Sequence, residues 1–247
     1  MKKSIDLICI MCIHNESLNL EDCIKHLYKY VDNFVVFDDE STDNSIEILK
    51  KFPKVTEIIT EKQNGEHKWR ERYNRETVLR KAKEISNADE TWVLCVDPDE
   101  RFEKSFLRNM RKIIKRNSGK AINIHFRELW DSIYQYRNDG IWNDKNKTLL
   151  FPLSEKMTFD YENEHHIPWI YRELNDIVSL DYNLYHLKMV KKEDREKRKD
   201  LYNKLDPNKV MQAIGYDYLV NTEDLSLEKI KFKDRYDYKT VPSYYKD

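Results

Sequence analysis

The 247-residue sequence contains only four glycines and six prolines, and neither residue is concentrated in one segment. This scarcity argues against a flexible linker or a low-complexity segment before the last few dozen residues, and no internal repeat is apparent. An excess of charge of one sign is also missing, because 44 Lys and Arg residues face 45 Asp and Glu residues. A balanced chain gives no reason to expect nucleic acid as a partner.

Long apolar runs and cysteine clusters are absent as well. No apolar segment approaches the roughly 20 residues that span a bilayer, and the apolar run 5–13 contains Asp6 and lacks a small-residue cleavage site. We therefore expect a cytoplasmic protein without a transmembrane segment. The four cysteines lie in apolar segments without the spacing of a zinc site, so we expect them to be reduced and structural.

Strand-like and helix-like segments alternate over the first hundred residues. The patterns predict strands at 5–13, 34–37, 55–60 and 92–96, and helices at 17–31, 45–52 and 68–85. This alternation favours an α/β fold with a Rossmann-like, mostly parallel sheet flanked by helices. A chain of this length is large enough to bury roughly 70% of its unfolded surface.

Acidic residues follow three of these strands at the point where each strand ends. The groups are His14-Asn15-Glu16 after the first strand, Asp38-Asp39 after the second, and Asp97-Pro98-Asp99-Glu100 after 92–96. Because the carboxyl ends of parallel strands meet at one edge of a sheet, we expect ligand-binding side chains to converge there. Helix capping accounts in part for Asn15, Ser41 and Asp43, but not for Asp38, which follows the apolar 34–37 directly.

The Asp97-Pro98-Asp99 motif has a specific chemical meaning. Two aspartates separated by one residue can share a divalent cation and, through it, a diphosphate, because Mg²⁺ and Mn²⁺ prefer oxygen ligands and often keep only one or two protein carboxylates. A simple helix cap for the helix expected near Glu103 would explain one of these acids but not the pair.

Together, three segments resemble family-2 glycosyltransferases of the GT-A fold. They are His14-Asn15-Glu16, Val36-Phe37-Asp38-Asp39-Glu40-Ser41-Thr42-Asp43 and Trp92-Val93-Leu94-Cys95-Val96-Asp97-Pro98-Asp99-Glu100. The resemblance implies metal-dependent transfer of a sugar from a nucleotide-diphosphate donor, most commonly a UDP-sugar, to a glycan, a lipid-linked sugar or another hydroxyl acceptor, with Mn²⁺ or Mg²⁺ as the cofactor. It also implies that Asn15 and Glu16 lie in the donor site, that Asp38 and Asp39 contact the base and ribose, that Asp97 contacts the diphosphate and metal, and that Asp99 holds the metal directly.

The resemblance extends to about residue 205. Leu150-Phe151-Pro152, Phe159 and His165-His166 are similar to a segment in which many members carry an acceptor-side His-Glu pair, but this chain reads Glu162-Asn163-Glu164-His165-His166. For an inverting displacement, a carboxylate must take the proton of the acceptor hydroxyl. We expect Glu164 to be this base, with Glu162 as the second choice.

Two further assignments follow from the same resemblance. His186, in the segment Leu184-Tyr185-His186-Leu187, is similar to a late histidine that completes the metal site in some members. A donor-contacting arginine is expected on the helix 68–85, where Arg72 and Arg75 are the nearest equivalents. Most other charges of that helix are explained as a solvated face with pairs within the helix.

The remaining features leave alternatives open. Trp130, Tyr134, Tyr136 and Trp142 could stack on sugar rings as an acceptor platform, although core packing is the default for aromatic residues. We expect residues 1–190 to form the GT-A domain, with a nucleotide-sugar-binding half at 1–100 and an acceptor half at 101–190. A helical extension follows at 191–247, and the Lys and Tyr residues of 229–247 are compatible with peripheral membrane contact.

Two other functions compete with glycosyl transfer. A phosphohydrolase with an aspartate nucleophile also carries an Asp-x-Asp strand end, but such enzymes place it at the first strand and want Thr or Val where this chain has Arg101. A non-catalytic module that binds a nucleotide sugar would keep Asp38, Asp39, Asp97 and Asp99 and lack a base.

Overall fold

The computed structural model describes residues 4–64, 70–159, 169–209 and 212–246. Its strands are β1 (Ile5–Ile13), β2 (Asn33–Asp38), β3 (Val55–Thr60), β4 (Glu90–Cys95), β5 (Glu100–Phe102), β6 (Ala121–Glu128), β7 (Gln135–Arg137), β8 (Asn146–Pro152), β9 (Ile177–His186) and β10 (Leu227–Lys229). Its α-helices are α1 (Leu20–Leu27), α2 (Ser45–Leu49), α3 (Glu71–Ile85), α4 (Lys104–Arg116) and α5 (Lys192–Leu205).

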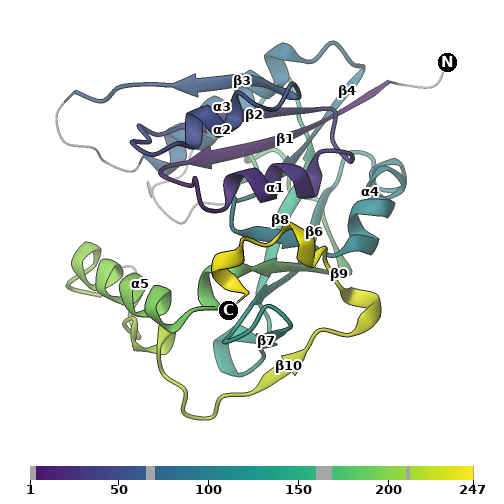
Figure 1. The fold of residues 1–247 in the computed structure, drawn as a ribbon. Coiled ribbons are helices and arrows are strands. Elements are labelled where there is room, and N and C mark those ends of the chain that lie inside the picture. The colour runs from purple at the N-terminus through teal and green to yellow at the C-terminus, as the bar shows by residue number, and fades with distance from the viewer. Residues whose placement is uncertain (1–3, 65–69, 160–168, 210–211, 247) are drawn as a thin grey trace.

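Eight strands form one sheet in the order β3-β2-β1-β4-β8-β6-β9-β5, and β10 pairs separately with β7 (Figure 1). Strand β1 lies between β2 and β4 and is parallel to both, and β3 is parallel to β2. Strand β8 runs antiparallel to its neighbours β4 and β6, whereas β6 and β9 are parallel. The predicted mostly parallel α/β sheet is confirmed, with antiparallel strands confined to its second half.

The predicted helices are present but shorter than expected. The helix predicted at 17–31 is α-helical only over α1. Beyond its C-terminal end, Lys54 Nζ donates hydrogen bonds to the carbonyls of Tyr28 and Val31, both at 2.7 Å, which hold the chain in a turn. The helix predicted at 45–52 ends at Leu49, and the one predicted from 68 begins at Glu71.

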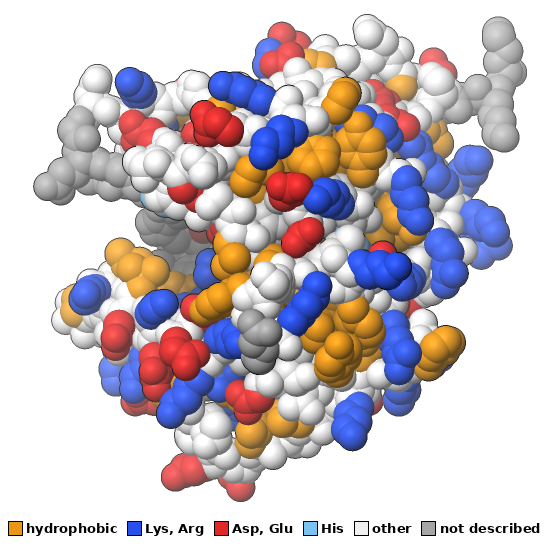
Figure 2. Space-filling view, in the orientation of Figure 1, with side chains coloured by type: hydrophobic (Ala, Val, Ile, Leu, Met, Phe, Trp, Pro, Cys, Tyr) orange, Lys and Arg blue, Asp and Glu red, His pale blue; other side chains and the backbone are white. Residues whose placement is uncertain are grey.

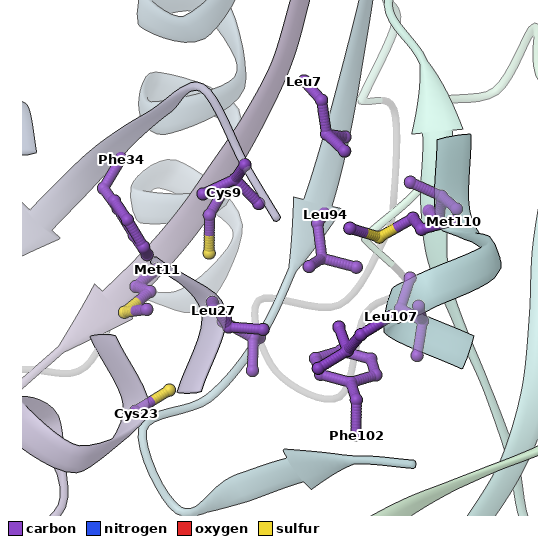
Figure 3. Packing of buried hydrophobic residues seen from close by; sticks show 14 of the residues in the cluster. Leu7, Cys9, Met11, Cys23, Leu27, Phe34, Leu94, Phe102, Leu107 and Met110 are labelled. Carbon is purple, nitrogen blue, oxygen red and sulfur yellow. The ribbon is translucent and has the colours of Figure 1, made fainter. Parts of the chain in front are cut away.

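The sheet has a separate apolar core on each face. Leu7, Cys9 and Met11 of β1 point toward α1 and α4, where Leu27 and Met110 meet them (Figure 3). The alternate β1 residues join a second cluster that includes Val78, Leu79 and Ala82 of α3. Helices thus cover both faces, which explains why β1 is apolar almost throughout. All four cysteines are buried and free, as predicted.

The chain after α5 returns to the sheet. Strand β10 pairs with β7, and Tyr236, Val241 and Tyr245 pack with Tyr185 and Leu187 at the end of β9. Within the described part of 191–247, only Lys192–Leu205 is α-helical; four three-residue 3₁₀ turns and β10 are separated by irregular segments. None of the helices in the described parts of the chain is both long and apolar enough to span a bilayer.

Candidate functional site

The site is built where β1, β2 and β4 end together. Ile13 is in register with Asp38, and Asp39 N donates to Ile13 O at 2.8 Å. On the other side of β1, Val96 N donates to Ile10 O at 3.2 Å. These bonds bring the three acidic strand ends to one edge of the sheet, as the sequence predicted.

Asp99, His186 and Glu128 form a buried chain of three side chains at this edge. His186 Nε2 lies 3.1 Å from Asp99 Oδ2, and His186 Nδ1 lies 2.6 Å from Glu128 Oε2. The residues come from the loop after β4, the end of β9 and the end of β6. Both ring nitrogens of His186 therefore face a carboxylate.

Electrostatics in this group follow from burial and pairing. Burial alone would lower the pKa of His186, but Asp99 and Glu128 outweigh it and raise that pKa to about 10. Burial would raise the carboxyl pKa values, yet the imidazolium holds the pKa of Asp99 well below its usual range and lowers that of Glu128 to about 2. These pKa directions favour an imidazolium on His186 between two carboxylates, Asp99 and Glu128.

Short strand β5 fixes the Asp99 loop against His186. Glu100 is opposite His186 in the antiparallel β5–β9 pairing, and Leu187 N donates to Asp99 O at 2.8 Å. The fully buried guanidinium of Arg101 donates to the carbonyls of Pro98 at 2.8 Å and of Thr240 at 2.5 Å. Arg101 therefore ties the acidic turn to the C-terminal segment. Because β5 stands between Asp99 and α4, Asp99 does not cap that helix.

Lys147 of β8 joins the other two acids of the turn. Its Nζ lies 2.8 Å from Asp97 Oδ2 and also contacts Glu100 Oε1. Burial would raise the pKa of Asp97, but Lys147 outweighs it and the pKa is lowered. For Glu100 burial dominates and raises the pKa to about 7. Lys147 therefore provides the partly buried positive charge that lowers the pKa of Asp97.

Glu16 and the half-exposed Lys188 lie beside Asp99. Lys188 Nζ is 3.8 Å from Asp99 Oδ2 and 3.9 Å from Glu16 Oε1. Burial, followed by the charge of Asp99, raises the pKa of Glu16 to about 7. Arg198 of α5 adds positive charge facing Glu128 and Asp99 and donates through Nε to Tyr202 Oη at 2.9 Å.

The Asp38 and Asn15 positions differ in what they do. Asp38 is buried, and although its Oδ2 accepts a bond from Ser41 N at 3.2 Å, its Oδ1 has no hydrogen-bond partner among the described residues. The Asp39 Oδ1 atom is 3.4 Å from Gln63 Nε2. The exposed Asn15 has a left-handed backbone, with φ of 56°, and its Oδ1 accepts from Thr42 N at 2.7 Å. Asn15 therefore joins two loops of the site.

The remaining predicted site residues are the two arginines of α3 and the two candidates for the base. Arg75 of α3 pairs with Glu71 at 2.5 Å, stacks over the Trp169 ring at 4.5 Å and faces Asp97 electrostatically. Arg72 lies on the same helix. Glu162 and Glu164 lie outside the described residues.

The aromatic platform is mostly a core. Trp130, Tyr136 and Trp142 are buried, and the two tryptophan rings pack against each other at 5.6 Å. Only Tyr134, 56% exposed, presents its ring to solvent. Core packing is thus the role of three of the four residues.

Sequence reasoning missed Glu128, Lys147, Lys188 and Arg198. Glu128 carried a usable signal. It is an acid at the end of Ala121–Glu128, where apolar and polar residues alternate as in a strand, and it resembles the acids after β2 and β4 in this respect. The lysines and Arg198 carried none, since they are single cations in charged surroundings. Among the described residues, no group of three or more His, Cys, Asp or Glu is arranged to hold a metal ion by itself.

Comparisons with known proteins point to one family. The sequence profile of glycosyl transferase family 2 matches residues 8–172, two thirds of the chain. No curated protein matches the sequence.

Solved structures support the fold. The chain is similar to S. aureus TarS, with a TM-score of 0.50 and 17% identity over 87% of this chain and 42% of that one. The shorter TarS 1-349 gives a TM-score of 0.50 and 14% identity over 87% of this chain and 69% of that one. A weaker similarity, with a TM-score of 0.34 and 14% identity over 50% of this chain and 44% of the other, is to glucosyl-3-phosphoglycerate synthase from Mycobacterium tuberculosis, crystallised with Mn²⁺ and UDP.

Proposed function

The chain belongs to glycosyl transferase family 2, and we propose that it transfers a sugar from a nucleotide-diphosphate donor to a hydroxyl acceptor with inversion at the anomeric carbon. The single observation that carries this proposal is the Asp99–His186–Glu128 group at the carboxyl edge of the sheet, beside the acid Asp97. An aspartate-nucleophile phosphohydrolase is not supported, because the Asp-x-Asp motif follows the fourth strand and the family match covers it.

The residues fit a divalent cation such as Mn²⁺ or Mg²⁺. Asp99 offers a carboxylate oxygen, and His186 would offer Nε2 once the cation displaces the Nε2 proton, because Glu128 accepts from Nδ1 in the way that orients metal-binding histidines in proteins. Asp97 would contribute a second carboxylate, directly or through water. A cation held there supplies positive charge for the nucleoside diphosphate that leaves. The remaining ligands would be the phosphates of the donor, as is common for Mg²⁺.

Two lysines prepare the site for a charged ligand. Lys147 pairs with both Asp97 and Glu100, so its positive charge offsets part of the negative charge of these acids beside the diphosphate. Lys188 is 44% exposed and lies 3.8 Å from Asp99, where its ammonium group can reach a phosphate oxygen. Both cations would stabilise the negative charge that develops on the leaving diphosphate.

The nucleotide would bind at the end of β2. The buried Oδ1 of Asp38 has no partner in the described structure, which is costly unless a ligand N–H or O–H donates to it. This fits the base or ribose contact proposed for Asp38, with Asp39 beside it. Asn15 and Glu16 would shape this site by holding the loop, and Arg75, which faces Asp97, is a better candidate than Arg72 for the donor-contacting arginine. UDP is the proposed nucleotide because UDP-sugars are the commonest donors in the family.

Glu164, or alternatively Glu162, is proposed as the base that takes the proton of the acceptor hydroxyl. Replacing each separately with glutamine tests this role, and the variant of the true base should lose transfer while keeping nucleotide binding. If neither change lowers transfer, the base assignment is wrong. If donor binds but no acceptor reacts with any variant or the wild type, a non-catalytic binding module is the better description.

The deciding experiment measures thermal stability with UDP, GDP, CDP and TDP, each with and without Mn²⁺. A ligand that binds the native state at a hundredfold excess over its Kd stabilises it by about 2.7 kcal/mol. We expect stabilisation by UDP only when Mn²⁺ is present, and loss of that stabilisation in Asp38→Asn. Absence of stabilisation by every nucleotide would contradict the proposed donor site.

A further inference from the structure

Helix α4 has a polar face of a single sign. Its thirteen residues contain six Lys and Arg and no acid. The buried face consists of Phe106, Leu107, Met110, Ile113 and Ile114, and the exposed cations are Lys104, Arg108, Lys112, Lys115 and Arg116. Like charges three or four residues apart on a helix repel one another. The fold therefore bears a cost here that its own packing does not explain.

Few of these cations are neutralised. Arg111 forms a close pair with Asp32 at 2.7 Å, and Lys104 lies 3.6 Å from Asp237. Within the described parts of the chain, the other four cations of the helix have no acidic partner within 4 Å. Their charge is directed to solvent.

An exposed aromatic residue lies next to this helix. Phe232, in the 3₁₀ turn Phe232–Asp234, is 83% exposed, the highest value among the large apolar side chains that the structure describes. The turn packs against α4, and Lys104 N donates to Arg235 O at 3.0 Å. Lys231 and Lys233 flank Phe232, and the Arg235 guanidinium stacks over its ring at 4.8 Å. A bare ring surrounded by cations has no role in the core.

Helix α1 and the residues that follow it extend this surface. Lys25, Lys29 and Tyr30 line a cavity of about 370 Å³ together with Lys104 and Arg108. Lys25 pairs with Glu21 at 2.6 Å, and the cavity also includes Asp237. We call the whole surface the basic face. Its members are Lys25, Lys29, Lys104, Arg108, Lys112, Lys115, Arg116, Lys231, Phe232, Lys233 and Arg235.

Acids are present on the basic face but in the minority. Asp234 lies 3.9 Å from Lys233, and Glu228 lies 3.4 Å from Lys231. Figure 2 shows Lys and Arg side chains gathered along the right-hand edge, over the position of α4 in Figure 1. Since the whole chain has a formal net charge of −1, this gathering is a separation of charge within a nearly neutral protein.

We propose that the basic face docks on an anionic lipid bilayer, with α4 parallel to the membrane and Phe232 inserted at the headgroup level. Clustered Lys and Arg on an amphipathic helix are attracted to anionic lipids, and an exposed aromatic ring adds apolar contact at the interface. A soluble polyanion would use the cations but would leave Phe232 exposed. The aromatic residue is why the bilayer is the favoured occupant.

Co-sedimentation of the whole protein with vesicles tests the proposal. Vesicles of phosphatidylcholine alone are compared with vesicles that contain about 30% phosphatidylglycerol, near 0.15 M ionic strength. We expect binding only to the anionic vesicles. The triple variant Arg108→Glu, Lys112→Glu, Lys115→Glu should weaken the partition coefficient at least about a hundredfold.

The single variant Phe232→Ser separates insertion from charge, and we expect it to weaken binding about tenfold. The matched control changes three exposed lysines elsewhere by the same total charge, Lys156→Glu, Lys192→Glu and Lys197→Glu. It should weaken binding less than tenfold. All variants are checked for an unchanged thermal midpoint, because each altered side chain is at the surface.

Three results would overturn the proposal. The first is equal binding of the wild type to neutral and anionic vesicles, or none to either. The second is an equal loss in the control triple variant, which would mean that total charge alone matters. The third is full binding by Phe232→Ser combined with complete displacement by soluble polyphosphate, which would identify a polyanion site instead.

Discussion

Two buried histidines lie on either side of strand β5 and differ in almost every property. His186 faces the carboxylates of Asp99 and Glu128, and its pKa is raised to about 10. His26 accepts from Phe102 N at 2.9 Å through Nε2 and lies 3.1 Å from Thr240 Oγ1 through Nδ1. Burial, reinforced by the positive charge of Arg101, holds the pKa of His26 well below its usual value.

The contrast shows that burial alone does not decide the charge of a side chain here, because both rings are buried and only the one that lies between two carboxylates has a raised pKa. Thr240 Oγ1 donates to Asp237 O at 2.7 Å, so it accepts from His26, and the ring is a neutral link between α1, β5 and the C-terminal segment. His186 instead lies among charges of both signs, as groups at ligand sites often do. One histidine holds the fold together and the other belongs to the site.

The largest expected effect on activity comes from removing a carboxylate that faces His186. Asp99→Asn keeps the shape of the side chain and removes the carboxylate charge that faces Nε2. We expect kcat/KM for sugar transfer to fall by at least about 1,000-fold, or about 4 kcal/mol in the barrier, because a cation-binding carboxylate is lost. The measurement is steady-state transfer with saturating Mn²⁺.

Asp97→Asn is the matched comparison for Asp99→Asn. Asp97 is paired with Lys147 rather than with a histidine, and its expected loss is smaller. Full turnover by Asp99→Asn, or a larger loss in Asp97→Asn, would reverse the proposed roles of the two acids.

A smaller effect is expected from Glu128→Gln, which leaves His186 in place but removes the carboxylate charge that faces Nδ1. Loss of such an orienting carboxylate costs about 10- to 100-fold in metal affinity or activity. The readout is Mn²⁺ affinity by electron paramagnetic resonance, together with turnover. Lys145→Met is the control, because Lys145 contacts Glu128 from its exposed side at 3.2 Å and should change the affinity less than threefold. Unchanged Mn²⁺ affinity in Glu128→Gln would remove Glu128 from the site.

The smallest effect concerns His26 and is seen in stability rather than activity. Because the folded pKa lies below the unfolded one, the unfolded state binds the proton first, and stability falls as the pH drops below about 6.5. Between pH 7 and pH 5 this contributes a loss of at most about 2 kcal/mol.

Urea unfolding of the wild type and of His26→Gln at both pH values measures the His26 contribution. Glu16 and Glu100, whose pKa values burial raises, contribute with the opposite sign in both proteins and cancel in the difference. An identical pH dependence in the two proteins would mean that His26 is not held neutral in the fold.

The sequence predicted the part of the candidate site whose acidic residues come directly after strands. Asp38, Asp97 and Asp99 stand directly after apolar runs, so parallel topology was enough to bring them to one edge. Glu128 also ends a strand, but placing it and Lys147 beside Asp99 requires the register of β6 and β8, which lie next to antiparallel pairings that local patterns do not define.

Helix lengths and the C-terminal region were predicted less well for related reasons. The end of α1 depends on Lys54, which is distant in sequence, and the aromatic residues Trp130 and Trp142 could be assigned to a core only once α5 and its neighbours were in place. The three-residue strand β5 is too short for a periodic signal. Each of these features is decided by tertiary contacts rather than by local sequence.

The hydrogen bond from Arg101 to Thr240 has a consequence for synthesis. The two residues are 139 positions apart, and chains are made at about 5–20 residues per second, so the turn that carries Asp97 and Asp99 waits roughly 7–28 s for its last support. During that interval the parallel strands β1 to β4 are already available to pair. The nascent chain can therefore pair β1 to β4 before the C-terminal segment supports its acidic turn.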